Sequence, residues 1–176
     1  MPSTFRLITY NIHKCRGWDR RVSTERIARV LAPLDADCIG LQEVVDGSPV
    51  GRLNQAQAIA HALGDKYTVI FGRTLDLRGS DYGNATLTRL TVDSSEQYNL
   101  TWKHREPRGC LRTDLRLKRG MPLHIFNVHL GTSYLERRAQ GPLLLSDEML
   151  NNAAHTGRDR VGSLASGGRF SRSFLA

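Results

Sequence analysis

The sequence predicts an α/β layered domain, and two observations lead to this prediction. In the first 64 residues, segments with the apolar pattern of buried strands alternate with segments that have helical periodicity. From Tyr67 onward, short strand-like segments follow one another, as in an antiparallel meander. The length of 176 residues fits one domain, and a composition that is 40% hydrophobic and 24% charged is ordinary for a globular protein.

The first elements alternate between strand and helix. Residues 5–11 and 37–42 have the apolar character of buried strands. A helix is expected after Ser23, because its hydroxyl is a favoured N-cap, and a second helix is expected from Asn54 to the stop at Gly64. The apolar stripe of the first helix falls at Ile27, Val30, Leu31 and Leu34.

The second part of the chain is rich in predicted strands. These strands are expected at residues 67–72, 84–90, 97–102, 110–117 and 123–130. In residues 110–117 apolar side chains alternate with Arg112, Asp114 and Arg116, so we expect a half-solvated antiparallel strand. A final helix from Ser133 places on one stripe Leu135, Ala139 and Leu143.

The end of the chain has a different composition. Residues 155–176 contain four Gly, four Ser and four Arg, and their apolar residues show no sustained period. Such a segment buries too little apolar surface to order itself. We therefore expect a domain over residues 1–154 and a basic, poorly ordered tail over residues 155–176.

The charge favours polyanionic partners. The formal net charge is +8 and the isoelectric point is near 9.9, which suits phosphorylated substrates, nucleic acid or anionic lipid. No long run of Lys and Arg marks a dedicated nucleic-acid arm. Nucleic acid and lipid therefore both stay open as partners.

The cysteines and the apolar segments indicate a cytoplasmic protein. Cys15, Cys38 and Cys110 form an odd set without metal-type spacing, which fits a reducing compartment. We expect no secretory signal, because the chain starts directly with a strand. No apolar run approaches the roughly 20 residues that span a bilayer, so no transmembrane segment is expected.

Three apolar strands each end on a residue that can act on a phosphoester. Asn11, Glu43 and His129 supply an amide, a carboxylate and an imidazole at the carboxyl ends of their strands. If these ends meet, the three side chains resemble part of a metal-assisted phosphoester site. An ion-paired strand-end Glu, a turn Asn and a core His remain the structural alternatives.

Five short motifs, in order, carry a family resemblance. They are Thr-Tyr-Asn11-Ile-His, Leu-Gln-Glu43-Val, Gly-Asn84-Ala-Thr-Leu-Thr-Arg, Arg105-Glu-Pro-Arg-Gly and Asn-Val-His129-Leu. Together they resemble the endonuclease/exonuclease/phosphatase superfamily, which is the family of DNase I-like enzymes. The resemblance implies the N-terminal part of a four-layer α/β sandwich, with a mixed sheet that has helices on one face. It also implies hydrolysis of phosphoesters with Mg²⁺ or Mn²⁺, by in-line attack of an activated water.

The resemblance assigns roles to the strand-end residues. Glu43 is implied as the metal ligand, which agrees with the preference of Mg²⁺ for one or two protein carboxylates. Asn11 is implied to orient the nucleophile, and His129 to bond the scissile phosphate. Arg105 is implied to bind phosphate in the catalytic site, and Arg108 is a second candidate for this contact.

Further residues are weaker candidates for substrate binding. Asn84 lies on a strand that in the family runs beside the site, and Tyr82 is close to it in sequence. His13 and Lys14 can contact substrate, and they can equally be surface residues.

The second half of the family pattern is missing from this sequence. Neither Gly-Asp-x-Asn nor Ser-Asp-His occurs after His129, and these motifs position and activate the attacking water in the family. We interpret the change of composition after residue 155 as the result of a frameshift or premature stop. The loss predicts impaired catalysis, an uncovered sheet face and self-association through that face. The alternatives are an inactive remnant that binds phosphate or nucleic acid, and a half-enzyme completed by another chain or by self-association.

Overall fold

The first four strands form a mixed sheet. The computed structural model of the chain describes residues 4–47 and 54–151. The strand order is β1-β2-β4-β3, with β1 parallel to β2 and the other neighbours antiparallel. The strands are β1 (Leu7–Asn11), β2 (Cys38–Asp46), β3 (Thr68–Asp76) and β4 (Asp81–Thr88).

Two amphipathic helices cover the outer face of this sheet, and both begin at the predicted caps. These are α1 (Thr24–Leu31) and α2 (Gln55–Ala62). The Ser23 hydroxyl accepts a bond from Arg26 N at 3.1 Å, and Asn54 Oδ1 accepts one from Gln57 N at 3.0 Å. Both caps are therefore confirmed. The core beneath these helices includes Ile27, Leu31, Ile39, Leu41, Ile59 and Leu87.

The next three strands form a second, antiparallel sheet with its own helices. The strand order is β5-β6-β7. The strands are β5 (Thr91–Asn99), β6 (Gly109–Arg116) and β7 (Pro122–Val128), and the helices are α3 (Tyr134–Leu144) and α4 (Asp147–Asn151). Three short 3-10 helices complete the elements of the described residues, at His13–Cys15, Ala32–Leu34 and Lys118–Gly120.

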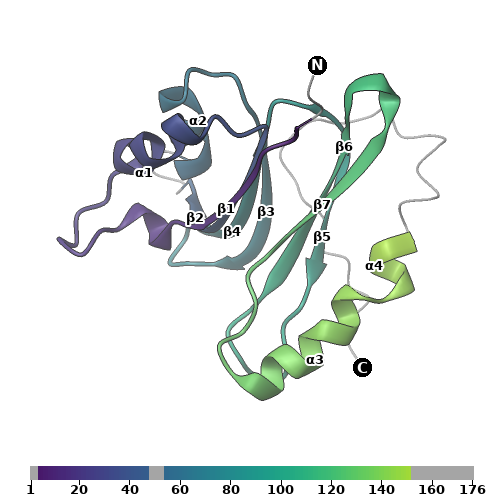
Figure 1. Cartoon of the computed structure of the whole chain (residues 1–176). Coiled ribbons are helices and arrows are strands. Elements are labelled where there is room, and N and C mark those ends of the chain that lie inside the picture. Colours follow the sequence, from purple (N-terminus) through teal and green to yellow (C-terminus); the bar gives the residue numbers. More distant parts are fainter. Residues whose placement is uncertain (1–3, 48–53, 152–176) are drawn as a thin grey trace.

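The elements stack in four layers, with the two sheets in the middle. Figure 1 shows α1 and α2 outside β1 to β4, and α3 and α4 outside β5 to β7. The sheets pack face to face through Cys38, Leu115 and Ile125. The predicted mixed sheet with helices on one face is confirmed, but its other face is not open as expected, because the second sheet covers it. The prediction of self-association is untested, and the uncovered sheet face on which it was based is not present in the described part of the chain.

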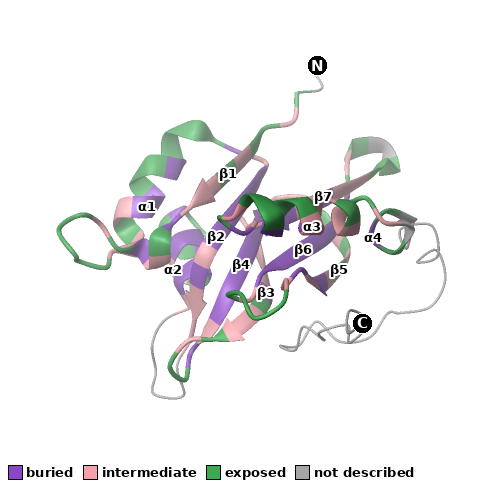
Figure 2. Ribbon diagram, turned by 90° about the horizontal axis from the view of Figure 1, so that it is seen from below, coloured by how far each residue is buried: buried purple, intermediate pink, exposed green. Residues whose placement is uncertain are grey.

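Strand β6 is buried on both faces, so the prediction of a half-solvated strand is wrong. Arg112 is only 2% exposed, and its guanidinium pairs with Asp114 through bonds of 2.8 and 3.1 Å. Arg112 Nη1 also donates to Met149 O in α4 at 3.1 Å. Figure 2 shows β6 in the buried colour beside α3 and α4. Arg112 and Asp114 therefore lie on a face that the helices shield from water, and there they pair with one another.

Helix α3 also differs from the predicted apolar stripe. Leu135 is exposed, whereas Glu136 and Gln140 are buried toward the second sheet. Gln140 Oε1 accepts a bond from Gly131 N and its Nε2 donates to Leu100 O, both at 2.9 Å. The inward face of this helix thus combines polar bonding to loops with the apolar packing of Leu143, the member of the predicted stripe that packs against the core of the second sheet.

A buried amide joins the two sheets. Asn127 Nδ2 in β7 donates to Leu41 O at 3.1 Å and to Ala85 O at 2.9 Å. Its Oδ1 accepts a bond from Gln42 Nε2 at 2.7 Å. Gly40 leaves room for this side chain, because an added Cβ would lie 3.2 Å from Asn127 Cγ. The packing register of the sheets is therefore set by hydrogen bonds as well as by apolar contact.

The tail predicted to be poorly ordered, residues 155–176, lies outside the described residues. Within the described part of the chain, no helix combines the length and apolar character needed to cross a membrane.

We predict that Arg112→Met lowers the free energy of unfolding by about 3 kcal/mol, because it leaves Asp114 buried without its guanidinium. Breaking a buried ion pair typically costs about 3–5 kcal/mol. We expect a value at the lower end of this range because His124 and Ser94 still contact the Asp114 carboxylate. Urea unfolding followed by circular dichroism measures the change. The matched control Arg116→Met breaks the more exposed pair with Asp93 and should cost less than about 1 kcal/mol. Equal losses in the two variants would contradict the assigned role of the buried pair.

Candidate functional site

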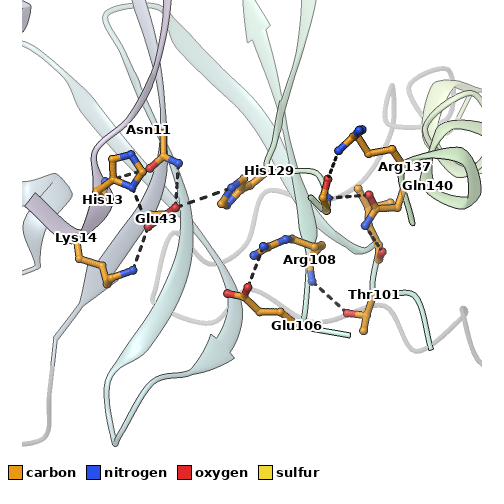
Figure 3. Close-up of polar contacts among 12 residues, drawn as sticks. Asn11, His13, Lys14, Glu43, Thr101, Glu106, Arg108, His129, Arg137 and Gln140 are labelled. Carbon is orange, nitrogen blue, oxygen red and sulfur yellow. Dashed lines mark hydrogen bonds and ion pairs between the residues drawn. The ribbon is translucent and has the colours of Figure 1, made fainter. Parts of the chain in front are cut away.

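The polar residues predicted at the strand ends converge at one end of the sandwich. Figure 3 shows Glu43 between Asn11 on one side and His129 on the other. Asn11 ends β1, Glu43 lies in β2, and His129 follows β7 directly, so both sheets contribute to the site.

A β-bulge orients Glu43. The pairing of β2 with β4 shifts between Leu41 and Val44, and Glu43 has a left-handed φ of 57°. Such a bulge redirects a side chain that a regular strand would point elsewhere. Beyond the bulge, Val45 N donates to Gln55 Oε1 at 3.0 Å, and the strand continues to Asp46. The sequence had indicated a strand that ends at residue 42, and this boundary is wrong because β2 continues to Asp46.

The Glu43 carboxylate is ionised and held by three neighbours. Asn11 Nδ2 donates to its Oε1 at 2.9 Å, and Lys14 Nζ donates to its Oε2 at 3.0 Å. His13 Nδ1 lies 3.5 Å from the same Oε2. Burial alone would raise the pKa of Glu43, but the bonds from Asn11 and Lys14 and the nearby positive charges outweigh it and lower the pKa to about 2.

His129 faces this carboxylate from the second sheet. Its Nε2 lies 3.9 Å from Glu43 Oε1. Burial, followed by the charge of Arg108, lowers the pKa of His129 below its ordinary value, so the neutral ring predominates at pH 7. A neutral imidazole carries a single N–H, which can donate one hydrogen bond to a phosphate oxygen.

The loop after His129 is clamped by α3. Gln140 binds Gly131 N, and Arg137 Nη1 donates to Gly131 O at 3.2 Å and to Thr132 O at 2.6 Å (Figure 3). Sequence reasoning missed Gln140 and Arg137 as supports for the site. The available signal was two polar residues three apart on the helix that follows the Asn-Val-His motif.

Arg108 lies beside His129 in a small surface pocket. The pocket is lined by Thr74, Tyr82, Gly83, Asn84, Pro107, Arg108, Gly109 and His129. The Arg108 side chain is nearly buried, and its Nη2 donates to Glu106 Oε2 at 2.9 Å. Its Nε is buried without a hydrogen-bond partner within the described part of the chain. A guanidinium that lines a pocket fits an anionic ligand.

The two candidate arginines are placed differently. Arg105 is exposed and does not line the pocket that contains Arg108 and His129. The structure thus brings Arg108 to the site and leaves Arg105 at the surface, although sequence reasoning ranked Arg105 first. Glu106, the partner of Arg108, was also missed, and its position two residues before Arg108 was the available signal.

Asn84 and Tyr82 line the pocket from β4. Asn84 Nδ2 donates to Gly109 O at 3.2 Å and to Asn127 O at 3.1 Å, so its amide nitrogen holds the two sheets together. Tyr82 lies with its ring 5.4 Å from Lys14 Nζ. Burial and the charge of Glu43 raise the pKa of Tyr82, which keeps its hydroxyl neutral and able to donate.

The residues present fit a weak site for a hard divalent cation. Within residues 4–47 and 54–151, no group of three or more His, Cys, Asp or Glu side chains is placed to hold a metal. Glu43 is nevertheless an ionised oxygen donor, and Mg²⁺ commonly uses one or two carboxylates while water and substrate oxygens complete its coordination. Glu43 would hold the cation, with Asn11 beside it.

Comparisons with known proteins identify the family of the chain. The model of the endonuclease/exonuclease/phosphatase family matches residues 8–158. The uncharacterized protein YbhP of Escherichia coli is 26% identical over 151 residues, which cover 80% of this chain and 59% of that protein. The chain therefore spans about three fifths of this curated relative.

Solved structures show the same fold. The endonuclease/exonuclease/phosphatase from Beutenbergia cavernae aligns with a TM-score of 0.71 and 23% identity, over 80% of this chain and 43% of that one. TDP2 from C. elegans aligns with a TM-score of 0.63 and 19% identity, over 85% of this chain and 43% of that one. The match of the family model covers most of the sequence. The chain therefore belongs to the endonuclease/exonuclease/phosphatase family.

Proposed function

We propose that this chain carries the cation-binding and phosphate-binding part of a phosphoesterase that depends on Mg²⁺ or Mn²⁺. The family includes metal-dependent nucleases and phosphatases. The observation that carries the proposal is the placement of an ionised Glu43 opposite a neutral His129, with the buried Arg108 beside that histidine. Carboxylate, imidazole and guanidinium are the groups that bind a hard cation and a phosphate together.

Each side chain has a role in this proposal. Glu43 binds the cation, which supplies Lewis-acid stabilisation of the charge on phosphoryl oxygens. Asn11 holds the Glu43 carboxylate in place and orients the attacking water. His129 and Arg108 donate to the non-bridging oxygens of the phosphate. Hydrolysis proceeds by in-line attack of water on the phosphorus: a P–O bond to the water oxygen forms, the opposite ester P–O bond breaks, and the leaving alkoxide departs as an alcohol with the proton that the water loses.

The rate of this chain alone is expected to be low. The sequence lacks the Ser-Asp-His motif, whose Asp-His pair is expected to activate water in the family that the chain resembles. Loss of a general base typically costs about 10²–10⁴-fold in rate. A polyanionic substrate is favoured by the net charge of +8, with nucleic acid before anionic lipid.

A second candidate function is phosphate or nucleic-acid binding without catalysis. The position of Arg108 in the lining of the pocket supports it, because a guanidinium can hold a phosphate whether or not water is activated. Hydrolysis assays separate the two functions.

A cytoplasmic location is part of the proposal. All three cysteines are buried as free thiols. Burial is the main cause that raises the pKa of Cys15 and Cys110 to about 12 and that of Cys38 to about 11. Such neutral thiols are compatible with a reducing compartment.

We predict that Glu43→Gln lowers the Mg²⁺- or Mn²⁺-dependent hydrolysis of bis-p-nitrophenyl phosphate and plasmid DNA at least about a hundredfold, because a neutral amide binds a hard cation poorly. The control Glu148→Gln changes an exposed carboxylate on α4 and should leave the rate unchanged. Equal rates in wild type and Glu43→Gln would reject the catalytic proposal and favour binding alone.

We predict that Arg108→Ala weakens phosphate recognition about tenfold to a hundredfold, whereas Arg105→Ala changes it less than about threefold. The two arginines lie in one loop, and only Arg108 lines the pocket. Titration of inorganic phosphate followed by ³¹P NMR, together with kcat/KM for the diester, measures both variants. A larger effect at Arg105 would show that the exposed arginine makes the contact.

A further inference from the structure

The Lys14 ammonium occupies the free side of the Glu43 carboxylate. Asn11 binds Oε1, and Lys14 Nζ binds Oε2 at 3.0 Å, as Figure 3 shows. The Lys14 side chain is 44% exposed, whereas Glu43 is 13% exposed. The ammonium therefore reaches an inward-facing carboxylate from the solvent side, the side from which a dissolved cation would also arrive.

The backbone around Lys14 is unusual and firmly held. His13, Lys14 and Cys15 have successive left-handed φ angles of 47°, 58° and 56°. Hydrogen bonds fix this turn: Cys15 N donates to Ile12 O at 2.8 Å, and Gln55 Nε2 donates to Lys14 O at 2.9 Å. Left-handed conformations are unfavourable for residues with a Cβ, and they persist where the surrounding structure holds them in place. Here the geometry directs the lysine to the site.

The single Glu43 carboxylate is contacted by the Lys14 ammonium and by two imidazoles. Lys14 and His13 approach Oε2, and His129 approaches Oε1. Within the described residues, Glu43 does not belong to a group of three or more His, Cys, Asp or Glu side chains placed to hold a metal. A divalent cation on Oε2 would meet the Lys14 ammonium at short range in a partly buried place, where like charges repel strongly.

We propose that the Lys14 ammonium and a divalent cation are alternative, mutually exclusive partners of the Glu43 carboxylate. Lys14 neutralises Glu43 while the cation is absent, and cation binding displaces the ammonium. The displaced ammonium, which is already close to the Tyr82 ring in the phosphate pocket, adds positive charge for an incoming phosphate. This inference rests on the proposed cation site at Glu43.

The first test measures Mn²⁺ binding directly, by the electron paramagnetic resonance signal of free Mn²⁺. Lys14→Met should bind Mn²⁺ roughly tenfold more tightly than wild type, because the competing cation is gone. Lys14→Arg keeps the charge and should stay within about threefold of wild type. Circular dichroism confirms that each variant is folded.

Lys66→Met is the matched control for this substitution. Lys66 is 45% exposed, lies 5.8 Å from the ring of Tyr67, and pairs with Asp35 at 3.6 Å. Lys66 therefore has nearly the same exposed fraction as Lys14 and the same kinds of contact, a carboxylate and a tyrosine ring, but it lies away from Glu43. Its replacement should change Mn²⁺ affinity less than about twofold, because remote surface charges are screened.

The second test follows the lysine in the unaltered protein. Reductive methylation read by mass spectrometry should modify Lys14 at least about threefold faster at saturating Mg²⁺, because the ammonium leaves its ion pair. Lys66 is the internal control and should not respond. In Glu43→Gln, Lys14 should react quickly with or without Mg²⁺.

The outcomes separate this inference from the proposed function. Binding of Mn²⁺ that depends on Glu43 but is unchanged by Lys14→Met, with no change in Lys14 methylation, would overturn the exchange and leave the cation site intact. Absence of Glu43-dependent binding in wild type and in Lys14→Met would overturn both. Binding seen only in Lys14→Met would support the exchange in its strongest form.

Discussion

The amide of Asn127 joins the two sheets next to the site, and the geometry of the site depends on this connection. Its bonds to Leu41 O, Ala85 O and Gln42 Nε2 tie β7 to β2 and β4. Gln42 immediately precedes Glu43, and Asn127 lies two residues before His129. Because these amide bonds are buried and directional, a shift of one sheet against the other would break them and separate the carboxylate from the imidazole.

The site is electrostatically balanced from within. Glu43 pairs with Lys14, and Arg108 pairs with Glu106. His129 is neutral at pH 7 because burial and the charge of Arg108 lower its pKa. The groups expected to bind a cation and a phosphate are therefore already paired with side chains of opposite charge. Partly exposed partners such as Lys14 and Glu106 can exchange for a ligand at moderate cost, whereas the buried pair of Arg112 and Asp114 is structural.

Local signals predicted much of the fold, and nonlocal packing explains the errors. The caps at Ser23 and Asn54 follow from side-chain bonds to the nearest backbone, which the sequence alone encodes. The burial of Arg112 does not follow from periodicity. A strand has the same alternating sequence pattern whether its charged face is exposed to water or is covered by a helix and neutralised by ion pairs. The expected open sheet face was wrong for a similar reason: the strands of the second sheet were recognised individually, but their packing on the first sheet was not.

The sequence by itself determined the order of strands and helices, the family motifs and the identity of Asn11, Glu43 and His129 as residues at one end of the sandwich, because these depend on local pattern and on residue type. Tertiary structure alone decided the bulge that orients Glu43, the choice of Arg108 rather than Arg105 for the pocket, and the seat of Lys14 on the carboxylate. These features depend on strand register and on contacts between residues that are 29 to 85 positions apart in the sequence, and no local pattern carries that information.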